Sequence, residues 1–400
     1  MNLASLSVSY VRARPLQTVL SLLLLALGVA TVVVLLLVIG QLEERMQRDA
    51  RGVDLVVGAK GSPMQLILAG IYHADAPTGN IPFSAVGLLE KNRMVKRVMP
   101  LALGDSWRGY RIVGARKDYL DHHGAEFVAG KIFEKNMEVV LGAEVAARTG
   151  TGVGATFTGA HGISGEGAEH ADAPFKVVGV LAKTNSVLDR LVLTSIGSVW
   201  HVHEEHKGED HDEEDENEEG REVTVLLVEF ASPLAAATLS RSINAQSGLQ
   251  AASPAYETAR LFRMIGVGVE ALRGFGAILI LAAGLSVFIA LYSALEERRY
   301  DLAVMRTLGA SPRRLFGLLM TEGLVLALSG ALIGLALGHG LASALGAWLE
   351  HEQYPGVTGL QYRPEELWVL GVALVVSLAA ALLPAWRAYR TDVSQTLAKG

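Results

Sequence analysis

Cysteine is absent from the 400 residues, which excludes disulfide bonds and thiolate metal sites. Charged residues are scarce, at 19% against roughly 25% in soluble domains. The phosphate-binding pattern G-x-x-x-x-G-K-[ST] does not occur, because Gly130-Lys131 is followed by Ile132. The hydrolase patterns G-x-S-x-G and H-E-x-x-H are also missing, as is any basic, aromatic-rich patch suited to nucleic acid. We therefore expect a chain that is not an enzyme, binds no nucleotide itself and has no nucleic-acid partner.

Apolar residues make up 50% of the chain and collect in four long runs. The first has 23 uncharged residues, and at ~1.5 Å per residue a helix of this length crosses a ~30 Å hydrocarbon core. It exceeds the roughly 7–15 apolar residues of a cleaved signal, so we interpret it as an uncleaved signal anchor. The third run, interrupted by Glu322 and His339, has 35 residues and should project beyond the bilayer. The four predicted transmembrane helices are 18–40, 274–295, 315–349 and 367–386.

Arginines between the apolar runs predict the orientation in the membrane, because cytoplasmic loops carry an excess of Lys and Arg. Five of them lie between the second and third runs: Arg298, Arg299, Arg306, Arg313 and Arg314. The loop 350–366 has only Arg363 among four acids. We therefore expect a multi-pass protein of the cell inner membrane with both termini in the cytoplasm. The cytoplasmic segments are then 1–17, 296–314 and 387–400, and the extracytoplasmic ones are 41–273 and 350–366.

Residues 41–253 are predicted to form an α+β domain outside the membrane. Short β-branched runs alternate with turn residues, and a helical pattern occupies Leu234–Ser247. The expected strands are 53–57, 111–114, 138–141, 175–181 and 223–230. The apolar run Met64–Ile71 is suited to resting on the bilayer surface.

The segment 254–273 has the apolar spacing of a helix, and no proline interrupts the chain from Ala255 to Arg299. We expect one helix of about 65 Å, whose first part is a stalk between the outer domain and the second span. Such a helix can transmit motion if it has two discrete packings. The alternative is a separate stalk helix, broken at Gly266, Gly268 or Gly274.

Within the loop 296–314, Leu302, Met305 and Leu308 recur at three-residue spacing, which predicts a short amphipathic helix. Gly309 suits its end, and Ser311 before a proline suits the N-cap of the next helix. A short helix between two spans can lie on the membrane or dock in a groove of a partner protein.

Eleven residues of this loop and of the helix after it form a recognisable pattern: Glu297, Arg298, Leu302, Ala303, Met305, Arg306, Leu308, Gly309, Ala310, Ser311 and Glu322. The pattern resembles the signature of the FtsX/MacB/LolC-type permeases, except that Asp301 stands where the family usually has glutamate. The tail also matches, through Pro384, Ala385, Arg387, Ala388 and Leu397, although a proline common near Val393 is missing. The order of one span, a large outer domain and three further spans is that of the family. The outer domain is loosely similar to the MacB-like periplasmic core domain.

The resemblance implies the permease subunit of an ABC transporter complex, which transmits ATP-driven motion from a separate ATP-binding subunit to the outer domain. A second permease subunit, identical or different, and a periplasmic partner protein would complete the complex in the lipid bilayer. The residues that the resemblance assigns to ATPase coupling are Arg298, Asp301, Leu302, Met305, Arg306, Leu308, Gly309 and Ser311. The cargo stays open between a lipoprotein or other hydrophobic molecule, a metal-linked process, and mechanotransmission without cargo.

Small residues recur every four positions in the third run, which places them on one helix face: Gly330, Gly334, Gly338, Ala342 and Gly346. Such a stripe lets another helix approach closely. That helix could belong to the same subunit or to a second one, and both hypotheses stay open. His339, beside the stripe, is either a packed residue or a transport ligand.

Four histidines and eleven acids crowd residues 201–219, which carry a net charge of −10 and leave +4 for the rest of the chain. Imidazole and carboxylate suit Zn²⁺, so His201, His203, His206 and His211 are candidate ligands. The composition is equally typical of a solvated, disordered loop, which we place at 201–222. A zinc role would favour the alternative function, a membrane-anchored metal-binding sensor or chaperone without an ATPase.

Overall fold

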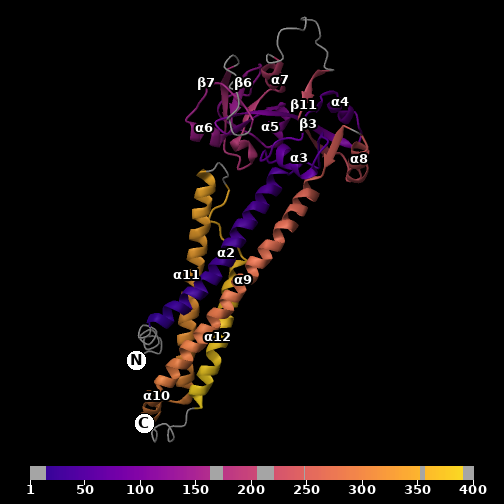
Figure 1. Ribbon diagram of the computed structural model, residues 1–400. Helices are drawn as coiled ribbons and strands as arrows, with labels where there is room; N and C mark the ends of the chain where they lie inside the picture. Colours follow the sequence, from indigo (N-terminus) through magenta and orange to yellow (C-terminus); the bar gives the residue numbers. More distant parts are fainter. Residues whose placement is uncertain (1–14, 163–173, 205–219, 247, 352–355, 391–400) are drawn as a thin grey trace. The chain divides into compact units, whose positions relative to one another are not determined.

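The computed structural model describes residues 15–162, 174–204, 220–246, 248–351 and 356–390 (Figure 1). The chain forms two compact units. One, here called the helical unit, comprises Met1–Glu44 and Met264–Gly400. The other, Arg45–Arg263, is called the inserted domain. The predicted fold class, four membrane helices with an α+β domain between the first and the second, is confirmed.

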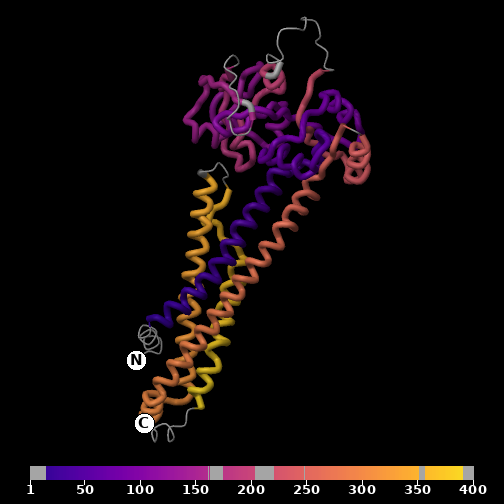
Figure 2. Tube along the Cα trace, in the orientation of Figure 1, coloured from indigo at the N-terminus to yellow at the C-terminus, as the bar shows by residue number. Residues whose placement is uncertain are grey.

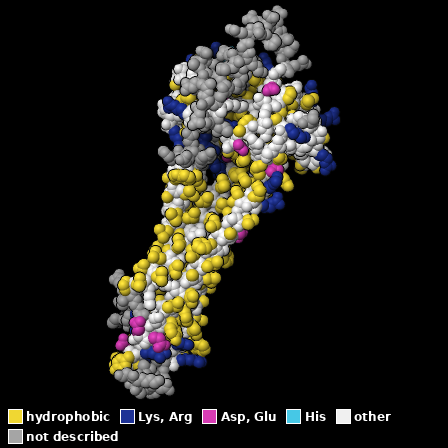
Figure 3. All heavy atoms as spheres, in the orientation of Figure 1, with side chains coloured by type: hydrophobic (Ala, Val, Ile, Leu, Met, Phe, Trp, Pro, Cys, Tyr) yellow, Lys and Arg dark blue, Asp and Glu magenta, His cyan; other side chains and the backbone are white. Residues whose placement is uncertain are grey.

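Among the residues that the structure describes, four helices are long and apolar enough to cross a membrane: α2 (Pro15–Asp49), α9 (Pro254–Glu297), α11 (Pro312–His351) and α12 (Glu366–Tyr389). Each extends past the apolar run from which it was predicted. A short helix, α10 (Arg299–Thr307), lies between α9 and α11 at one end of the unit (Figure 2). Apolar side chains cover most of the visible surface of the helices, and charged side chains gather at the α10 end (Figure 3).

Two clusters of buried side chains hold the helices together. One joins Leu25, Val29 and Val33 of α2 to small residues of the other three long helices. The second packs α10 against α9, α11 and α12 through leucines and alanines. Because lipid offers no hydrophobic drive for association, close packing of this kind stabilises the contacts between membrane helices.

Helix α9 has 44 residues and continues through Gly266, Gly268 and Gly274 without a break. A helix of this length spans about 66 Å. The boundary between the two units falls inside α9, after Arg263, and inside α2, after Glu44. The chain therefore passes between the units within α2 and within α9. The alternative of a separate stalk helix is wrong, because α9 is continuous from Pro254 to Glu297.

The inserted domain is built on a mixed sheet of eleven strands. Nine of them follow the order β13-β1-β12-β3-β4-β10-β6-β9-β5, with β7 paired to β9 and β8 to β3; β11 and β2 form a separate pair. The strands are β1 (Leu55–Ala59), β2 (Ile81–Pro82), β3 (Val95–Trp107), β4 (Tyr110–Ala115), β5 (Phe127–Gly130), β6 (Glu138–Leu141), β7 (Thr156–Phe157), β8 (Ala160–His161), β9 (Phe175–Leu181), β10 (Val192–Thr194), β11 (Glu222–Val223), β12 (Val225–Phe230) and β13 (Leu249–Ala252). The helices are α3 (Pro63–Gly70), α4 (Ser84–Glu90), α5 (Lys117–His122), α6 (Ala143–Thr149), α7 (Ile196–Glu204) and α8 (Ala235–Asn244), with a 3₁₀ turn at Val187–Arg190.

Both faces of the sheet are buried, as β1 illustrates. Val56 belongs to one hydrophobic core, whereas Leu55 and Val57 belong to another. Successive strand residues point to opposite faces, so a strand covered on both sides is apolar throughout. This explains why β1, β6 and β12 are nearly continuous apolar runs in the sequence.

Two sequence interpretations of this domain are wrong. Met64–Ile71 does not form a surface-resting segment, since most of it is α3, whose Leu66 and Ile67 are fully buried in the core. Ser62 caps α3 by accepting a hydrogen bond from the Gln65 amide. The predicted loop 201–222 is too long, because α7 extends to Glu204 and β11 begins at Glu222.

Candidate functional site

Helix α10 is bounded by local backbone geometry that the sequence dictates. Gly309, directly after its C-cap, has a φ of +98°, a left-handed conformation that glycine adopts without steric cost. The amides of Gly309 and Ala310 donate to the carbonyls of Arg306 and Met305. The chain then turns into α11 at Pro312, so α10 and α11 are separated by a tight break.

The apolar residues of α10 do not share one outward face. Leu302 and Ala303 are buried, and Met305 packs against the same cluster of the helical unit. Leu308, in contrast, is 82% exposed, and Tyr300 is exposed as well. The predicted three-residue stripe is therefore divided, because Leu302 and Met305 pack against the other helices and Leu308 is exposed.

A buried ion pair fixes the start of α10. Nη1 of Arg298, the N-cap residue, lies 3.2 Å from Oε1 of Glu322 in α11, and the glutamate side chain is only 3% exposed. A buried carboxylate is stable only with a charged or hydrogen-bonding partner. The pair therefore fixes the position of α10 along the axis of α11. The other residues assigned to coupling lie at the surface, with Asp301 and Ser311 exposed and Arg306 half-buried.

At the same end of the unit, the tail residues connect α12 to α9. Arg387 donates a hydrogen bond to the Tyr292 hydroxyl, and its guanidinium lies 4.9 Å from the centre of that ring. Pro384, Ala385 and Ala388 are buried against the neighbouring helices. Leu397 lies outside the described residues.

The small-residue stripe of α11 faces α2 of the same chain. A Cβ at Gly334 would lie 2.7 Å from the Ala26 carbonyl oxygen, and one at Gly338 would lie 2.7 Å from a Val33 methyl carbon. Gly330 faces Leu25 in the same way, Ala342 is fully buried, and Gly346 lies against the backbone of Val357. Of the two hypotheses for the stripe, the structure shows the contact within one subunit.

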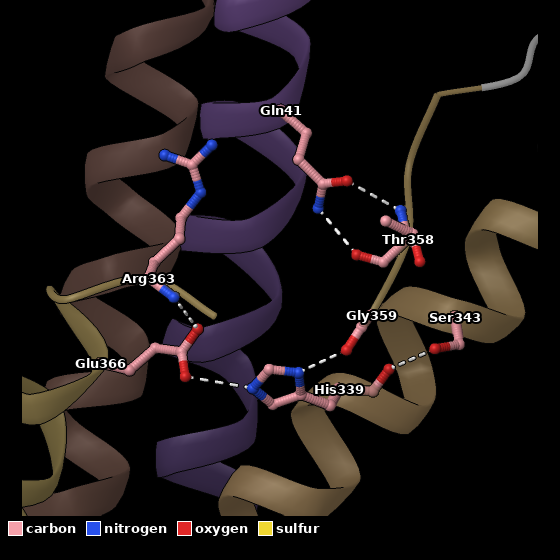
Figure 4. Close-up of polar contacts among 7 residues, drawn as sticks. All are labelled: Gln41, His339, Ser343, Thr358, Gly359, Arg363 and Glu366. Atoms are coloured by element: carbon pink, nitrogen blue, oxygen red, sulfur yellow. Dashed lines mark hydrogen bonds and ion pairs between the residues drawn. The ribbon is translucent and has the colours of Figure 1, made fainter. Parts of the chain in front are cut away.

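A second polar cluster joins α2, α11, α12 and the loop between α11 and α12 (Figure 4). His339 contacts Oε2 of Glu366 through Nε2 at 3.1 Å and the Gly359 carbonyl through Nδ1 at 2.5 Å. Gln41 and Thr358 exchange two hydrogen bonds, and Arg363 is paired with Glu44. The sequence pointed to His339 alone, because its partners are close only in the folded chain.

Comparison with known families identifies both units. Residues 18–246 match the model of the MacB-like periplasmic core domain, and residues 273–393 match the FtsX-like permease C-terminal model. The chain belongs to the FtsX/MacB-type permeases. With its four candidate spans, this permease is a multi-pass membrane protein.

Curated relatives of the permease match over a limited part of their length. The chain is 33% identical over 121 residues to the lipoprotein-releasing system transmembrane protein LolE of Haemophilus influenzae, covering 27% of this chain and 29% of that protein. It is 30% identical over 115 residues to LolC of Xylella fastidiosa, covering 25% and 28%. The extracellular domain of the Gram-positive ABC-type transporter YknZ is 13% identical with a TM-score of 0.29, over 50% of this chain and 98% of that domain.

The candidate zinc ligands of the permease are not brought together within the described residues. His201 lies exposed near the end of α7, and His203 belongs to the same helix. His206 and His211 lie outside the described residues. In the part of the chain that the structure describes, no group of three or more His, Asp or Glu side chains could hold a metal ion.

Proposed function

We propose that this permease is the membrane subunit of an ABC-type transporter, driven by a separate ATP-binding subunit that docks on α10. The observation that carries the proposal is the division of α10 into an anchored and an exposed part. Leu302 and the Arg298–Glu322 ion pair hold the helix to the unit, while Leu308 projects from it. When the exposed side of a helix held in this way is displaced, α9 and α11 should be displaced with it. The reason is that closely packed side chains allow little movement of α10 within the unit.

The proposed orientation places the α10 end in the cytoplasm and the inserted domain outside. The five arginines at this end support it, since positively charged loops remain on the cytoplasmic side. The aromatic residues of α12 support a span of the right length. From Trp368 to Trp386, both exposed, the helix rises about 27 Å, close to the hydrocarbon thickness.

Contacts inside the inserted domain support a mechanical role for α2 and α9. The Asp49 carboxylate, in the last turn of α2, accepts a hydrogen bond from the Val187 amide at 3.0 Å. The Tyr72 hydroxyl donates to the Met46 carbonyl of α2 and lies 3.1 Å from the Thr258 hydroxyl of α9. The ends of both helices are thus bonded to the domain, so that helix motion would reach the domain through them.

For the cargo, we propose a lipoprotein or another hydrophobic molecule taken up on the extracytoplasmic side. The support is the similarity to LolE and LolC, both named as parts of lipoprotein-releasing systems, over about a quarter of the chain. We further propose that a second permease subunit, identical or different, completes the complex, as the resemblance to the family implies.

Zinc binding by the acidic segment is an accessory proposal that rests on composition. The full-length protein should bind Zn²⁺ with micromolar or tighter affinity, and deletion of 201–219, which removes all four candidate histidines, should abolish the binding. Unchanged binding in the deletion variant would reject it.

The experiment for the main proposal is affinity purification of the full-length permease from native membranes, with ATP hydrolysis as the readout. Leu308→Asp should lose the co-purifying ATPase activity. Leu360→Asp is the matched control, an exposed leucine in the α11–α12 loop whose replacement should leave the activity in place. Since the chain has no cysteine, a single Leu308→Cys should react only with reagents that enter the cytoplasm. Labelling from outside, or equal loss of ATPase in both Asp variants, would contradict the proposal.

A further inference from the structure

Both ring nitrogens of His339 face oxygen atoms that can accept a hydrogen bond, so its contact with Glu366 depends on the protonation of the imidazole. A carbonyl oxygen only accepts hydrogen bonds, so Nδ1 of His339, 2.5 Å from the Gly359 carbonyl, carries a hydrogen. Nε2 then faces Oε2 of Glu366 at 3.1 Å. Without a hydrogen on one of the two atoms, an imine lone pair would face a carboxylate. A hydrogen on Nε2 as well as on Nδ1 would make the ring an imidazolium that donates to both acceptors.

Among the described residues, the neighbouring polar groups are engaged elsewhere and offer no other hydrogen to this contact. The Glu366 side chain is 1% exposed, and its other oxygen, Oε1, accepts from the Arg363 backbone amide. From α2, the Glu44 carboxylate is paired with the Arg363 guanidinium at 2.8 Å, and Gln41 is engaged with Thr358. From α11 itself, the Ser343 hydroxyl donates to the His339 carbonyl. Loss of the proton would leave a buried negative charge beside the imidazole lone pair, which is costly in a low-dielectric site.

The His339–Glu366 pair contacts the loop that follows α11. Residues 356–363 are attached to the helices at Thr358, at Gly359 and at Arg363, and Gly359 is bonded directly to the His339 ring (Figure 4). Gly359 also lies so close to α11 that a Cβ there would overlap the His339 carbonyl oxygen. Of the three attachments of the loop, the one at Gly359 thus depends on the imidazole staying where Glu366 holds it.

We propose that His339 and Glu366 form a proton-binding latch that closes the loop 356–363 onto α11 and α2. With the proton bound, the loop is held as in the structure; when the proton leaves, repulsion between the two acceptors releases Gly359 and the loop opens. Exposed Tyr362 and Trp368 lie beside the pair in sequence, and aromatic residues of this kind gather at the membrane–water interface. The His339 side chain itself is 24% exposed, which leaves the ring accessible to protons. The inference does not depend on an ATPase or on the cargo.

The test measures the position of the loop directly. Because the chain has no cysteine, spin labels can be placed at Leu341→Cys on α11 and Leu360→Cys in the loop, both exposed, in the full-length protein in lipid nanodiscs. Electron–electron distance measurements from about pH 5 to about pH 9 bracket the ordinary range of histidine titration. We expect one short distance at low pH and a longer one whose share rises with pH, by up to about tenfold per pH unit for a single linked proton.

Three variants separate the latch from general damage. Glu366→Gln supplies a permanent N–H toward Nε2 and should keep the short distance at every pH, whereas His339→Phe should show the long distance at every pH. Ser343→Ala, beside the pair but outside it, should keep the pH response. A second label pair on α9 and α11, at Leu281 and Leu341, should give one distance throughout if the bundle is intact. A pH-independent loop in the unmodified protein, or a pH response retained in Glu366→Gln, would overturn the proposal.

Discussion

The guanidinium of Arg298 lies 3.2 Å from the carboxylate of Glu322, although 24 residues and a sharp turn separate them in the chain. The two groups are far less exposed than ordinary surface ions, so their attraction is poorly screened by water. This ion pair makes α10 part of the bundle instead of a loose cytoplasmic loop.

Replacing Glu322 by alanine should therefore destabilise the helical unit by about 3–5 kcal/mol, because the Arg298 charge stays buried without this carboxylate. Denaturant titration of the full chain in detergent measures the effect. The double variant Arg298→Met with Glu322→Leu should recover most of the loss, since it removes both charges together. A loss below about 1 kcal/mol in the single variant would show that the pair is dispensable.

Gly334→Ala, which adds only a methyl group, should destabilise the contact between α2 and α11. Its Cβ would lie 2.7 Å from the Ala26 carbonyl oxygen, which is rigid backbone, so Gly334→Ala should cost about 1–3 kcal/mol by forcing α2 and α11 apart. Gly340→Ala is the matched control on the same helix, where the added Cβ meets nothing within 4 Å. Equal unfolding free energies for the two variants would argue against the tight α2–α11 contact.

Acid should loosen helix α5 of the inserted domain. Burial lowers the pKa of His123 to about 4, and burial lowers the pKa of His73 well below its usual value too. The folded domain then keeps His123 neutral while the unfolded chain binds a proton below about pH 6.5. Stability is consequently lost as the pH falls from about 6.5 to about 4, by at most about 3 kcal/mol for His123.

The measurement is amide hydrogen exchange of α5 in the full chain, compared at pH 7 and pH 5 after correction for intrinsic rates. His123→Phe keeps a ring against Tyr119 but cannot be protonated, so it should flatten the loss. Burial raises the pKa of Asp49, which makes the folded domain more stable as the pH falls. This contribution is the same in the unmodified protein and in His123→Phe, so it cancels when the two are compared. An unchanged pH dependence in the variant would exclude His123 as the cause.

Tyr72→Phe tests the attachment of α2 and α9 to the inserted domain. Losing the hydroxyl removes the bonds to the Met46 carbonyl and to Thr258, at a cost of about 1 kcal/mol. Exchange of the amides in the first turn of α9 should accelerate, while the central strand β12 should be unaffected. Acceleration spread evenly over the whole domain would point to general destabilisation instead.

Hydropathy predicted the spans but not the ends of the helices, because it reports the contact with lipid and not the backbone hydrogen bonds. The apolar run of the first span stops at Gly40, yet α2 continues to Asp49. Its last turns are held by the inserted domain, in part through the bond from Asp49 to Val187. Asp49 and Val187 are 138 positions apart in the sequence, so no local sequence pattern predicts their contact.

Strand β3, the longest in the sheet, was missed for a related reason. It contains Pro100, which is paired with Leu226 in the middle of the sheet, and Pro is depleted in central strands. It is also buried on both faces over much of its length, so it lacks the alternation that marks a half-exposed strand. In the same way, the family resemblance predicted the α10 region, while Gln41 and Thr358, 317 residues apart, had no sequence signal.

In the sequence, strand β11, which pairs with β2, stands between residue 219 and the strand β12 of the large sheet. Directly after β11, Thr224 accepts a hydrogen bond from the Leu103 amide and sets the register of β12 against β3. The pairings of β12 are made by residues that follow β11, so we expect changes in residues 205–219 to leave the nine-strand path in register. The site between α7 and β11 is accordingly a place where this architecture can accept a new binding sequence, whether through evolution or by design.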